Sequence, residues 1–196
     1  MTMSALEKTM SYTYNDYVTW DSEPRVELIN GNVYAMAAPS PKHQDTLLNL
    51  ALLFGNFLKG KSCKPFIAPI DVRLNYEYGD DTVVRPDLIV VCDKNRITDK
   101  SINGVPDLIV EILSPSTANI DKILKLNKYI EAGVKEYWIV DTADKTVYVY
   151  ILQTTKLSLK AYSLQETDKE AFEPTHDIKV GILEGLTVNL HDIFDG

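Results

Sequence analysis

Two stretches, VVRPDLIVVCD (Val83–Asp93) and PDLIVEILSPST (Pro106–Thr117), share the pentapeptide PDLIV. Each copy begins with Pro-Asp and continues as a nearly unbroken apolar run. Runs of this length without polar alternation predict strands that are covered on both faces of a sheet. No unit of fixed period recurs along the chain, so the doubled pentapeptide does not indicate a solenoid. The two copies therefore predict two buried strands, which can still carry different functional side chains.

The segments before these strands predict a hairpin and a helix. Asn30-Gly31 separates the strand-like runs Val26–Ile29 and Val33–Met36, which is a strong signal for a two-residue turn. His43–Lys59 has apolar residues on one side at helical spacing. A shorter helix is expected over Tyr14–Trp20.

The segments after them predict a crossover helix and further strands. The helix is expected over Ala118–Ala132, with Ser116 or Thr117 as its cap and Gly133 at its exit. Other strands are expected over Lys64–Ile67, Asp71–Asn75, Lys135–Asp141, Val147–Leu152 and Leu157–Tyr162, and Ile182–Phe194 alternates weakly. Without a convincing linker, we expect one α/β domain with a mixed sheet flanked by helices.

Composition restricts the class of protein. The chain has 196 residues, 45% of them hydrophobic, and no apolar run approaches the roughly 18 residues that cross a bilayer. We therefore expect a soluble, cytoplasmic protein without a membrane partner. The net charge of −8 disfavours nucleic-acid binding without excluding it. Cys63 and Cys92 lie among apolar neighbours, so reduced structural thiols are expected.

The acids of the two strands can be paired in two ways. Asp107 and Glu111 lie on one strand and would stand roughly 13 Å apart, too far to share a metal ion. If the two strands pair antiparallel, however, Asp87 lies beside Glu111, with Cβ atoms about 5 Å apart. Two carboxylates at that separation can hold one divalent cation.

Each of these acids has a simpler interpretation. Glu111 interrupts an apolar run, where an unpaired carboxylate would cost several kcal/mol. An ion pair with an arginine or lysine, for which Arg85 is the obvious candidate, would explain it equally well. Asp87 follows Pro86, and a Pro-Asp pair at a strand start is often only a turn.

Four stretches together resemble the PD-(D/E)XK nuclease superfamily, and within it the family known as "putative restriction endonucleases". These stretches are ELINGNVYAMAAPSPKH (Glu27–His43), the two PDLIV segments, and DKILKLNKYIEAGVKEYWIVD (Asp121–Asp141). The resemblance covers most of residues 25–150, and the whole chain, 1–196, is expected to form a single domain of this kind.

The resemblance implies a restriction-endonuclease-like fold and Mg²⁺-dependent hydrolysis of DNA phosphodiesters. Asp87 and Glu111 would bind the metal, and the main-chain carbonyl of Ile112 would complete the protein ligands. Oxygen ligands and retained waters suit Mg²⁺, with Mn²⁺ as a substitute.

The chain departs from the superfamily pattern at the lysine. The usual position is 113, which is leucine here. The family resemblance assigns the role to Lys125 of the sequence K-x-x-x-Y, which ends at Tyr129, and Lys122 is the reserve candidate.

A helical projection argues against Lys125. At about 100° per residue it falls opposite the apolar side. Its alternative is a solvated lysine paired with Asp121 at i,i+4. The apolar side of this projection is set by Ile120, Ile123, Leu126 and Ile130.

Glu27 and His43 lie on the matched motifs and are additional candidates. Glu27 could act as a further metal or water ligand, or could be an exposed acid on an edge strand. His43 could contact phosphate or transfer a proton, or could be a surface or capping histidine. Tyr129 and Trp138 are expected to be core aromatics.

Two functions from different classes follow. The first is a metal-dependent DNA endonuclease, active as a homodimer because cutting both strands of a duplex needs two sites. The second is a catalytically inactive module of the same fold with a DNA-binding or regulatory role, which the displaced lysine and the net charge favour.

Overall fold

The first PDLIV copy carries the chain from one β-sheet into another. In the computed structural model, which describes residues 11–20, 25–114, 120–153, 156–165, 172–173 and 175–196, β5 (Val83–Val84) lies in a five-stranded sheet. β6 (Leu88–Val91) lies in a six-stranded sheet. Pro86 separates the two strands and lacks the N–H that a continuous ladder would need. Arg85 and Asp87 are therefore held at the junction of the two sheets.

Both sheets are mixed, with parallel and antiparallel pairs, and their strands do not follow the order of the chain. The five-stranded sheet has the order β2-β1-β5-β4-β7, and the six-stranded sheet has the order β11-β10-β9-β8-β6-β3. The remaining strands of the first sheet are β1 (Val26–Ile29), β2 (Asn32–Ala35), β4 (Asp71–Arg73) and β7 (Ser101–Asn103). Those of the second are β3 (Lys64–Ile67), β8 (Leu108–Ile112), β9 (Glu136–Asp141), β10 (Thr146–Gln153) and β11 (Lys156–Ser163).

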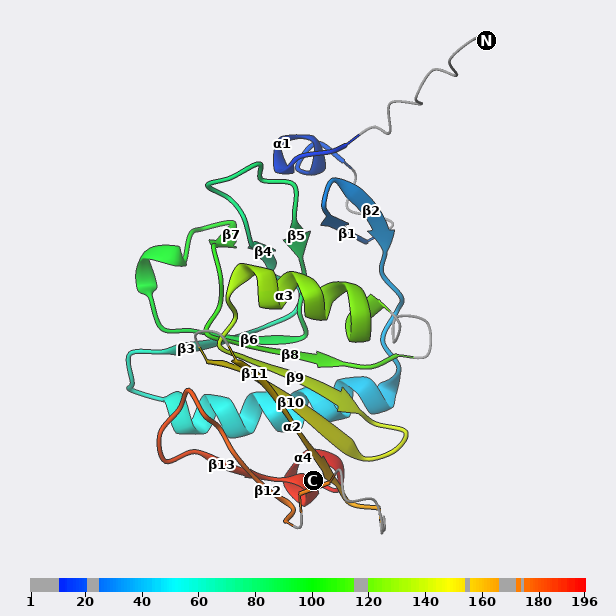
Figure 1. Ribbon diagram of the computed structural model, residues 1–196, viewed down its shortest axis with the longest axis vertical. Helices are drawn as coiled ribbons and strands as arrows, with labels where there is room; N and C mark the ends of the chain where they lie inside the picture. The colour runs from blue at the N-terminus through cyan, green and yellow to red at the C-terminus, as the bar shows by residue number, and fades with distance from the viewer. Residues whose placement is uncertain (1–10, 21–24, 115–119, 154–155, 166–171, 174) are drawn as a thin grey trace.

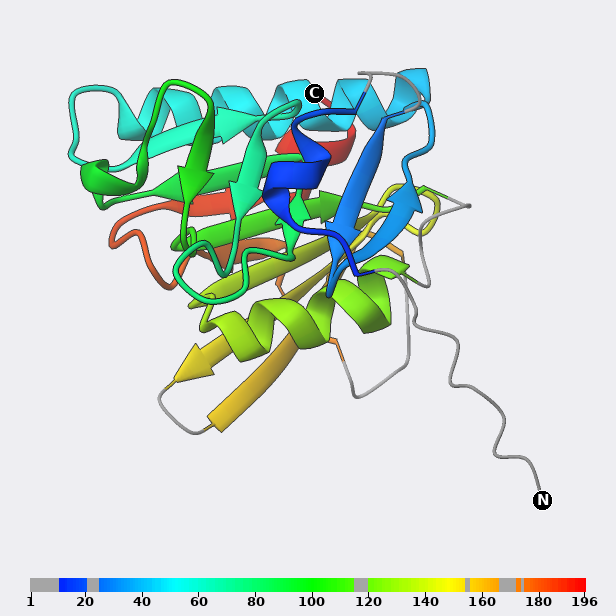
Figure 2. The same ribbon diagram turned by 90° about the horizontal axis from the view of Figure 1, so that it is seen from above.

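Helices cover the six-stranded sheet on both faces, and the two views agree on this (Figures 1 and 2). α2 (Pro41–Leu58) lies on one face, and α3 (Leu126–Ala132), which continues the π-helix η2 (Ile120–Lys125), lies on the other. The other elements are α1 (Tyr14–Tyr17), the 3₁₀-helix η1 (Lys94–Arg96), the pair β12 (Asp177–Lys179) and β13 (Thr187–Asn189), and α4 (Leu190–Phe194).

The two PDLIV strands, β6 and β8, are neighbours in the six-stranded sheet. β6 pairs antiparallel with β8, with Leu88 opposite Val110, and β8 pairs parallel with β9. Every residue of β6 and β8 is buried, because alternate side chains enter the core beneath α2 and the core beneath α3. The sequence-based prediction of strands covered on both faces, in a mixed sheet flanked by helices, is confirmed.

Several predicted element boundaries also agree with the structure. Asn30 and Gly31 have φ angles of 52° and 72°, the left-handed values that a tight hairpin turn requires. Ser40 caps α2 by accepting a hydrogen bond from the His43 N–H. Gly133 (φ 85°) ends α3 in the left-handed conformation. The proposed caps Ser116 and Thr117 lie outside the described residues.

The two cysteines differ from the prediction. Cys63 and Cys92 form a disulfide with an S–S distance of 2.08 Å. β3 and β6 pair with Lys64 opposite Val91, so the residues just beyond this pair face each other. Apolar neighbours in sequence gave no sign of this register, and the expectation of reduced thiols is therefore wrong for this structure.

Within the part of the chain that the structure describes, no helix is both long and apolar enough to span a membrane.

Candidate active site

The register of β6 and β8 brings Asp87 and Glu111 together. Leu88 lies opposite Val110, so the next step along this antiparallel ladder places Asp87 opposite Glu111 on the same face. The Ile112 N–H donates to Asp87 Oδ2 at 2.7 Å, which fixes the Asp87 carboxylate against β8. The predicted adjacency of the two acids agrees with this register, whereas their role as metal ligands stays a prediction.

His43 reaches the same aspartate from the first turn of α2. Its Nε2 lies 3.2 Å from Asp87 Oδ2, and the histidine is buried. The alternative of a surface histidine is therefore wrong. Pro41 and the Ser40 cap set the start of α2, and so place the imidazole over the end of β6.

Glu27 is buried between neighbouring strands. β1 pairs with β2 on one side and with β5 on the other, so it is not an edge strand. Glu27 Oε1 accepts from the Arg85 N–H at 2.7 Å, and Oε2 lies 2.9 Å from Lys125 Nζ. The alternative of an exposed edge-strand acid is wrong. The carboxylate of Glu27 contacts a backbone N–H through one oxygen and the Lys125 ammonium through the other.

Lys125 lies between two glutamates. Its Nζ is 2.9 Å from Glu27 Oε2 and 3.0 Å from Glu111 Oε1, and each of the three residues is only 4% exposed. The burial of Lys125 contradicts the alternative of a solvated lysine, and the side chain of Asp121, its partner in that alternative, lies outside the described part of the chain. The reserve candidate Lys122 has a side chain outside the described part of the chain.

The helical projection failed for two physical reasons. The i→i+5 bonding of the π-helix over Ile120–Lys125 breaks the spacing of 100° per residue on which the projection depends. In addition, Ile123, which the projection places on the apolar side, is 62% exposed, whereas Tyr129 is buried. Lys125 and Tyr129, four residues apart, consequently share the buried side.

Tyr129 completes this buried group. Its hydroxyl donates to Glu111 Oε1 at 2.7 Å, so that one carboxylate oxygen accepts from both the phenol and the Lys125 ammonium. Burial, and then the charge of Glu111, raise the pKa of Tyr129 well above its usual value. The phenol therefore remains a donor, a role that the expectation of a core aromatic did not include. The sequence feature that could have indicated this role is the four-residue spacing between Lys125 and Tyr129, which places both on one side of a helix.

The alternative of a buried Glu111 paired with an Arg or Lys agrees with its contact to Lys125, but Arg85, the candidate named for it, is not the partner. Its Nε donates to Asp71 Oδ1 at 2.6 Å, and the Tyr17 hydroxyl donates to the same oxygen at 3.0 Å. The register explains this, since Asp71 continues the β4–β5 ladder opposite Arg85. Burial lowers the pKa of Arg85, but the hydrogen bond to Asp71 and the nearby negative charges, that of Asp71 foremost, together raise it above its usual value.

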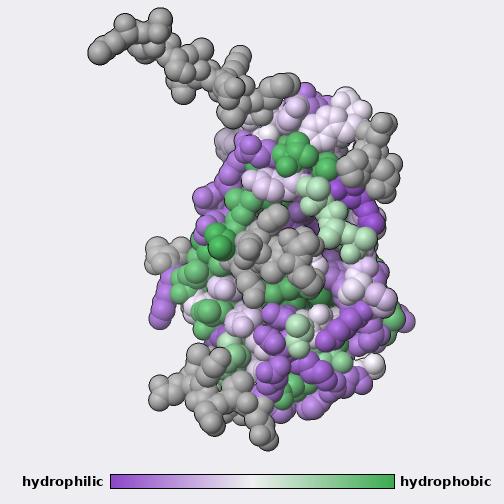
Figure 3. Space-filling model, turned by 90° about the vertical axis from the view of Figure 1, so that its right-hand side faces the viewer, coloured by the Kyte–Doolittle hydropathy of each residue, from purple (hydrophilic) through white to green (hydrophobic). Residues whose placement is uncertain are grey.

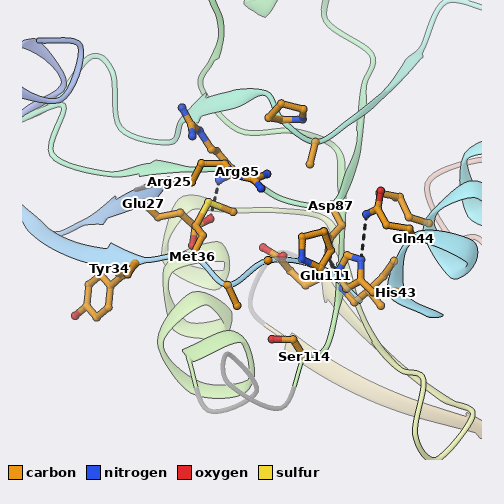
Figure 4. Close-up of a pocket in the computed structure, with 18 of the residues that line it drawn as sticks. Arg25, Glu27, Tyr34, Met36, His43, Gln44, Arg85, Asp87, Glu111 and Ser114 are labelled. Atoms are coloured by element: carbon orange, nitrogen blue, oxygen red, sulfur yellow. Dashed lines mark hydrogen bonds and ion pairs between the residues drawn. The ribbon is translucent and has the colours of Figure 1, made fainter. Parts of the chain in front are cut away.

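A cavity of about 200 Å³ opens at the junction of the two sheets. It is lined by Glu27, Asp87, Glu111 and Lys125, by His43 at the start of α2, and by residues of the β1–β2 hairpin. Figure 4 shows Asp87, Glu111 and His43 close together, with Glu27 and Arg25 on the hairpin side. On the side seen in Figure 3, apolar residues are interspersed among hydrophilic ones over the part that the structure describes.

Position 113 contributes to packing instead of to this cavity. Leu113 is 8% exposed and belongs to the core cluster that also contains Tyr129 and Tyr137. The sequence therefore supplies an apolar side chain from β8 and a cation from the following helix.

Comparison with known proteins identifies the family. The model of the Uma2 family, described as "Putative restriction endonuclease", matches residues 14–189. The chain belongs to this family. Two uncharacterised proteins of Synechocystis are similar, one 28% identical over 69% of this chain and 71% of its own, the other 27% identical over 71% and 80%.

The chain shares its fold with another protein whose crystal structure is known. That structure is of a putative nuclease belonging to DUF820 from Anabaena variabilis, with a TM-score of 0.72 and 19% identity over 94% of this chain and 98% of the other. The restriction-endonuclease-like fold expected from the sequence is thereby confirmed. The family match also extends beyond residue 150, to which the resemblance in sequence was confined.

The residues of the Uma2 site fit a hard divalent cation. Among the described residues, no three His, Cys, Asp or Glu side chains gather in a way that could hold one ion, and the candidate pair Asp87 and Glu111 is a set of two. Mg²⁺ is usually bound in this way, through one or two carboxylates and several waters.

Proposed function

We propose that this chain is a metal-dependent endonuclease that hydrolyses phosphodiester bonds of DNA, with Mg²⁺ as its cofactor and Mn²⁺ as a substitute. The observation that carries the proposal is the side-by-side arrangement of Asp87 and Glu111, with Lys125 Nζ 3.0 Å from Glu111. Membership of a family described as restriction endonucleases supports the same reaction class.

Each residue has a role in this proposal. Asp87 and Glu111 would hold the cation, with the Ile112 carbonyl as a further ligand, and the cation would supply a bound water of lowered pKa and positive charge opposite the phosphate. Lys125 stabilises the charge that develops on the phosphate oxygens or orients the attacking water. Glu27 and Tyr129 hold Lys125 and Glu111 in position, and His43 orients Asp87.

A module without catalysis is the second candidate. The observation that favours it is the pairing of Lys125 with two carboxylates, which neutralises the ammonium charge that a reaction would use. Such a module would bind DNA without requiring a divalent ion.

Cleavage by acid-site variants tests the proposal. We expect the purified protein to nick or cut DNA with Mg²⁺ or Mn²⁺, and Asp87→Ala and Glu111→Ala each to lower the rate at least about a hundredfold, since both remove a ligand of the ion. Asp192→Ala, at an exposed acid on α4, is the matched control and should cut normally. Undiminished cleavage by both site variants beside an active wild type would exclude this site.

A further inference from the structure

The charged groups of the candidate site lie deep in the protein. Glu27, Glu111 and Lys125 are each 4% exposed, at a cavity of only about 200 Å³. A reacting phosphate must therefore enter the cavity. Duplex DNA is stiff, with a persistence length of about 50 nm, and cannot extend one phosphate inward without deforming the helix. A flexible unpaired strand can.

The rim of the cavity has the chemistry that binds an unpaired strand. Tyr34 lies opposite Glu27 in the β1–β2 ladder, lines the cavity, and points its ring away from the carboxylates (Figure 4). It is half-buried, because part of its side chain packs against the core cluster beneath α3. Arg25 is exposed, two residues before Glu27 on the same face of the hairpin. Proteins that bind single strands combine aromatic rings, on which bases stack, with cations that contact the backbone.

The distribution of charge agrees with a short backbone contact. Arg85 and Lys125 also line the cavity, but both are paired with carboxylates, whereas the Arg25 side chain is at the surface. The chain as a whole carries a net charge of −8. Neutralising many phosphates of a duplex requires surplus lysine and arginine, whereas one arginine suffices for one phosphate.

We infer that the substrate of this cavity is an unpaired strand of DNA, with Tyr34 stacking on a base and Arg25 binding the adjacent phosphate. This inference rests on the proposed function for its reaction but concerns strand recognition. Tyr34 and Arg25 are thus specificity-determining residues on the β1–β2 hairpin.

Binding and cleavage of matched oligonucleotides test this inference. A fluorescein-labelled 20-nucleotide strand, alone or annealed to its complement, is titrated with protein without divalent ions, and binding is followed by fluorescence anisotropy. We expect the single strand to bind at least about tenfold more tightly than the duplex. Tyr34→Ala should weaken single-strand binding about tenfold, since stacking is lost. Arg25→Ala should weaken it similarly and reduce its salt dependence by about one phosphate.

Two control variants separate recognition from folding. Tyr34→Phe keeps the ring and should bind like wild type. Tyr78→Ala should also bind like wild type, since it removes a tyrosine that is 80% exposed and lies outside this cavity. Thermal melts show whether each variant folds, and Arg25→Ala, at an exposed position, tests the inference even if Tyr34→Ala is unstable.

The outcomes distinguish this inference from the proposed function. Equal binding and equal Mn²⁺-dependent cleavage of both DNA forms would overturn the strand preference while supporting the nuclease. The expected binding differences without any cleavage would do the reverse. Unchanged single-strand affinity in both Tyr34→Ala and Arg25→Ala would also overturn the inference.

Discussion

The side chain of Lys125 is stabilised by two carboxylates that would themselves be costly without it. Glu27 and Glu111 both approach its Nζ within 3.0 Å, and all three groups are almost fully buried. Removing one partner of a buried ion pair leaves an uncompensated charge, which costs about 3–5 kcal/mol. We expect Lys125→Met to lower the free energy of unfolding by this amount in urea titrations, and the added change Glu27→Gln to restore part of it.

A surface pair provides the comparison. Lys128 pairs with the exposed Glu131, and Lys128→Met should change the free energy of unfolding by less than about 1 kcal/mol, as exposed pairs do. If Lys125→Met were equally mild, the buried arrangement of Glu27, Lys125 and Glu111 would not describe the protein in solution.

Single residues of the candidate site differ in how far the sequence predicts them. The position of Asp87 beside Glu111 follows from two apolar strands, which the pentapeptides show, and from an antiparallel pairing, which the sequence left as a condition and the structure supplies. The burial of Glu27 does not, because it depends on β5 covering β1 from a distant part of the chain. Nor does the sequence show that the Arg85 guanidinium binds Asp71 rather than Glu111.

At the scale of elements, a buried carboxylate on β9 connects the sheet to the C-terminal segment. Glu136 Oε1 accepts from the Trp138 indole at 2.7 Å, and Oε2 accepts from the Ile182 N–H at 3.0 Å. Burial raises the pKa of Glu136 above its usual value, although these hydrogen bonds oppose the shift. The carboxyl is therefore charged less readily in the folded protein than in the unfolded chain.

The sign of the resulting pH dependence can be measured. With a raised folded-state pKa, Glu136 contributes most stability below its unfolded pKa of about 4.5, and this contribution is lost as the pH rises through the folded pKa. We expect the free energy of unfolding of wild type, relative to Glu136→Gln, to fall as the pH rises from about 4. Urea titrations across this range test it. Glu184→Gln, at an exposed position, should show no such trend, and a relative stability of Glu136→Gln that does not change with pH would contradict the shift.

Element prediction succeeded where long patterns or strong turn signals exist. The hairpin at Asn30-Gly31, α2 and the β10–β11 hairpin were predicted within a few residues. The three-residue strands β7 and β12 and the five-residue helix α4 were missed, because so few residues show no period, and these elements depend on contacts with distant segments. The π-helix was missed because every helical projection assumes regular spacing.

At the scale of the whole molecule, one chain contains every candidate residue of the site. Glu27, Asp87, Glu111 and Lys125 all line one cavity, although they come from both sheets and the crossover helix. The homodimer expected from duplex cutting stays a prediction, and an unpaired strand would need only one site. We therefore expect the specific activity on single strands to be independent of protein concentration, as measured by cleavage rates beside light-scattering masses. A rise in specific activity that follows dimer formation would show instead that the site acts only in pairs.

In the superfamily that the sequence resembles, the lysine usually stands at the strand position that is Leu113 here. The leucine fills the core beneath α3, and Lys125 carries the charge from a different element. The side-chain volume at position 113 and the positive charge at position 125 can thus change independently of each other. A relative that alters the crossover helix could lose or regain its chemistry while the sheet beneath it stays intact.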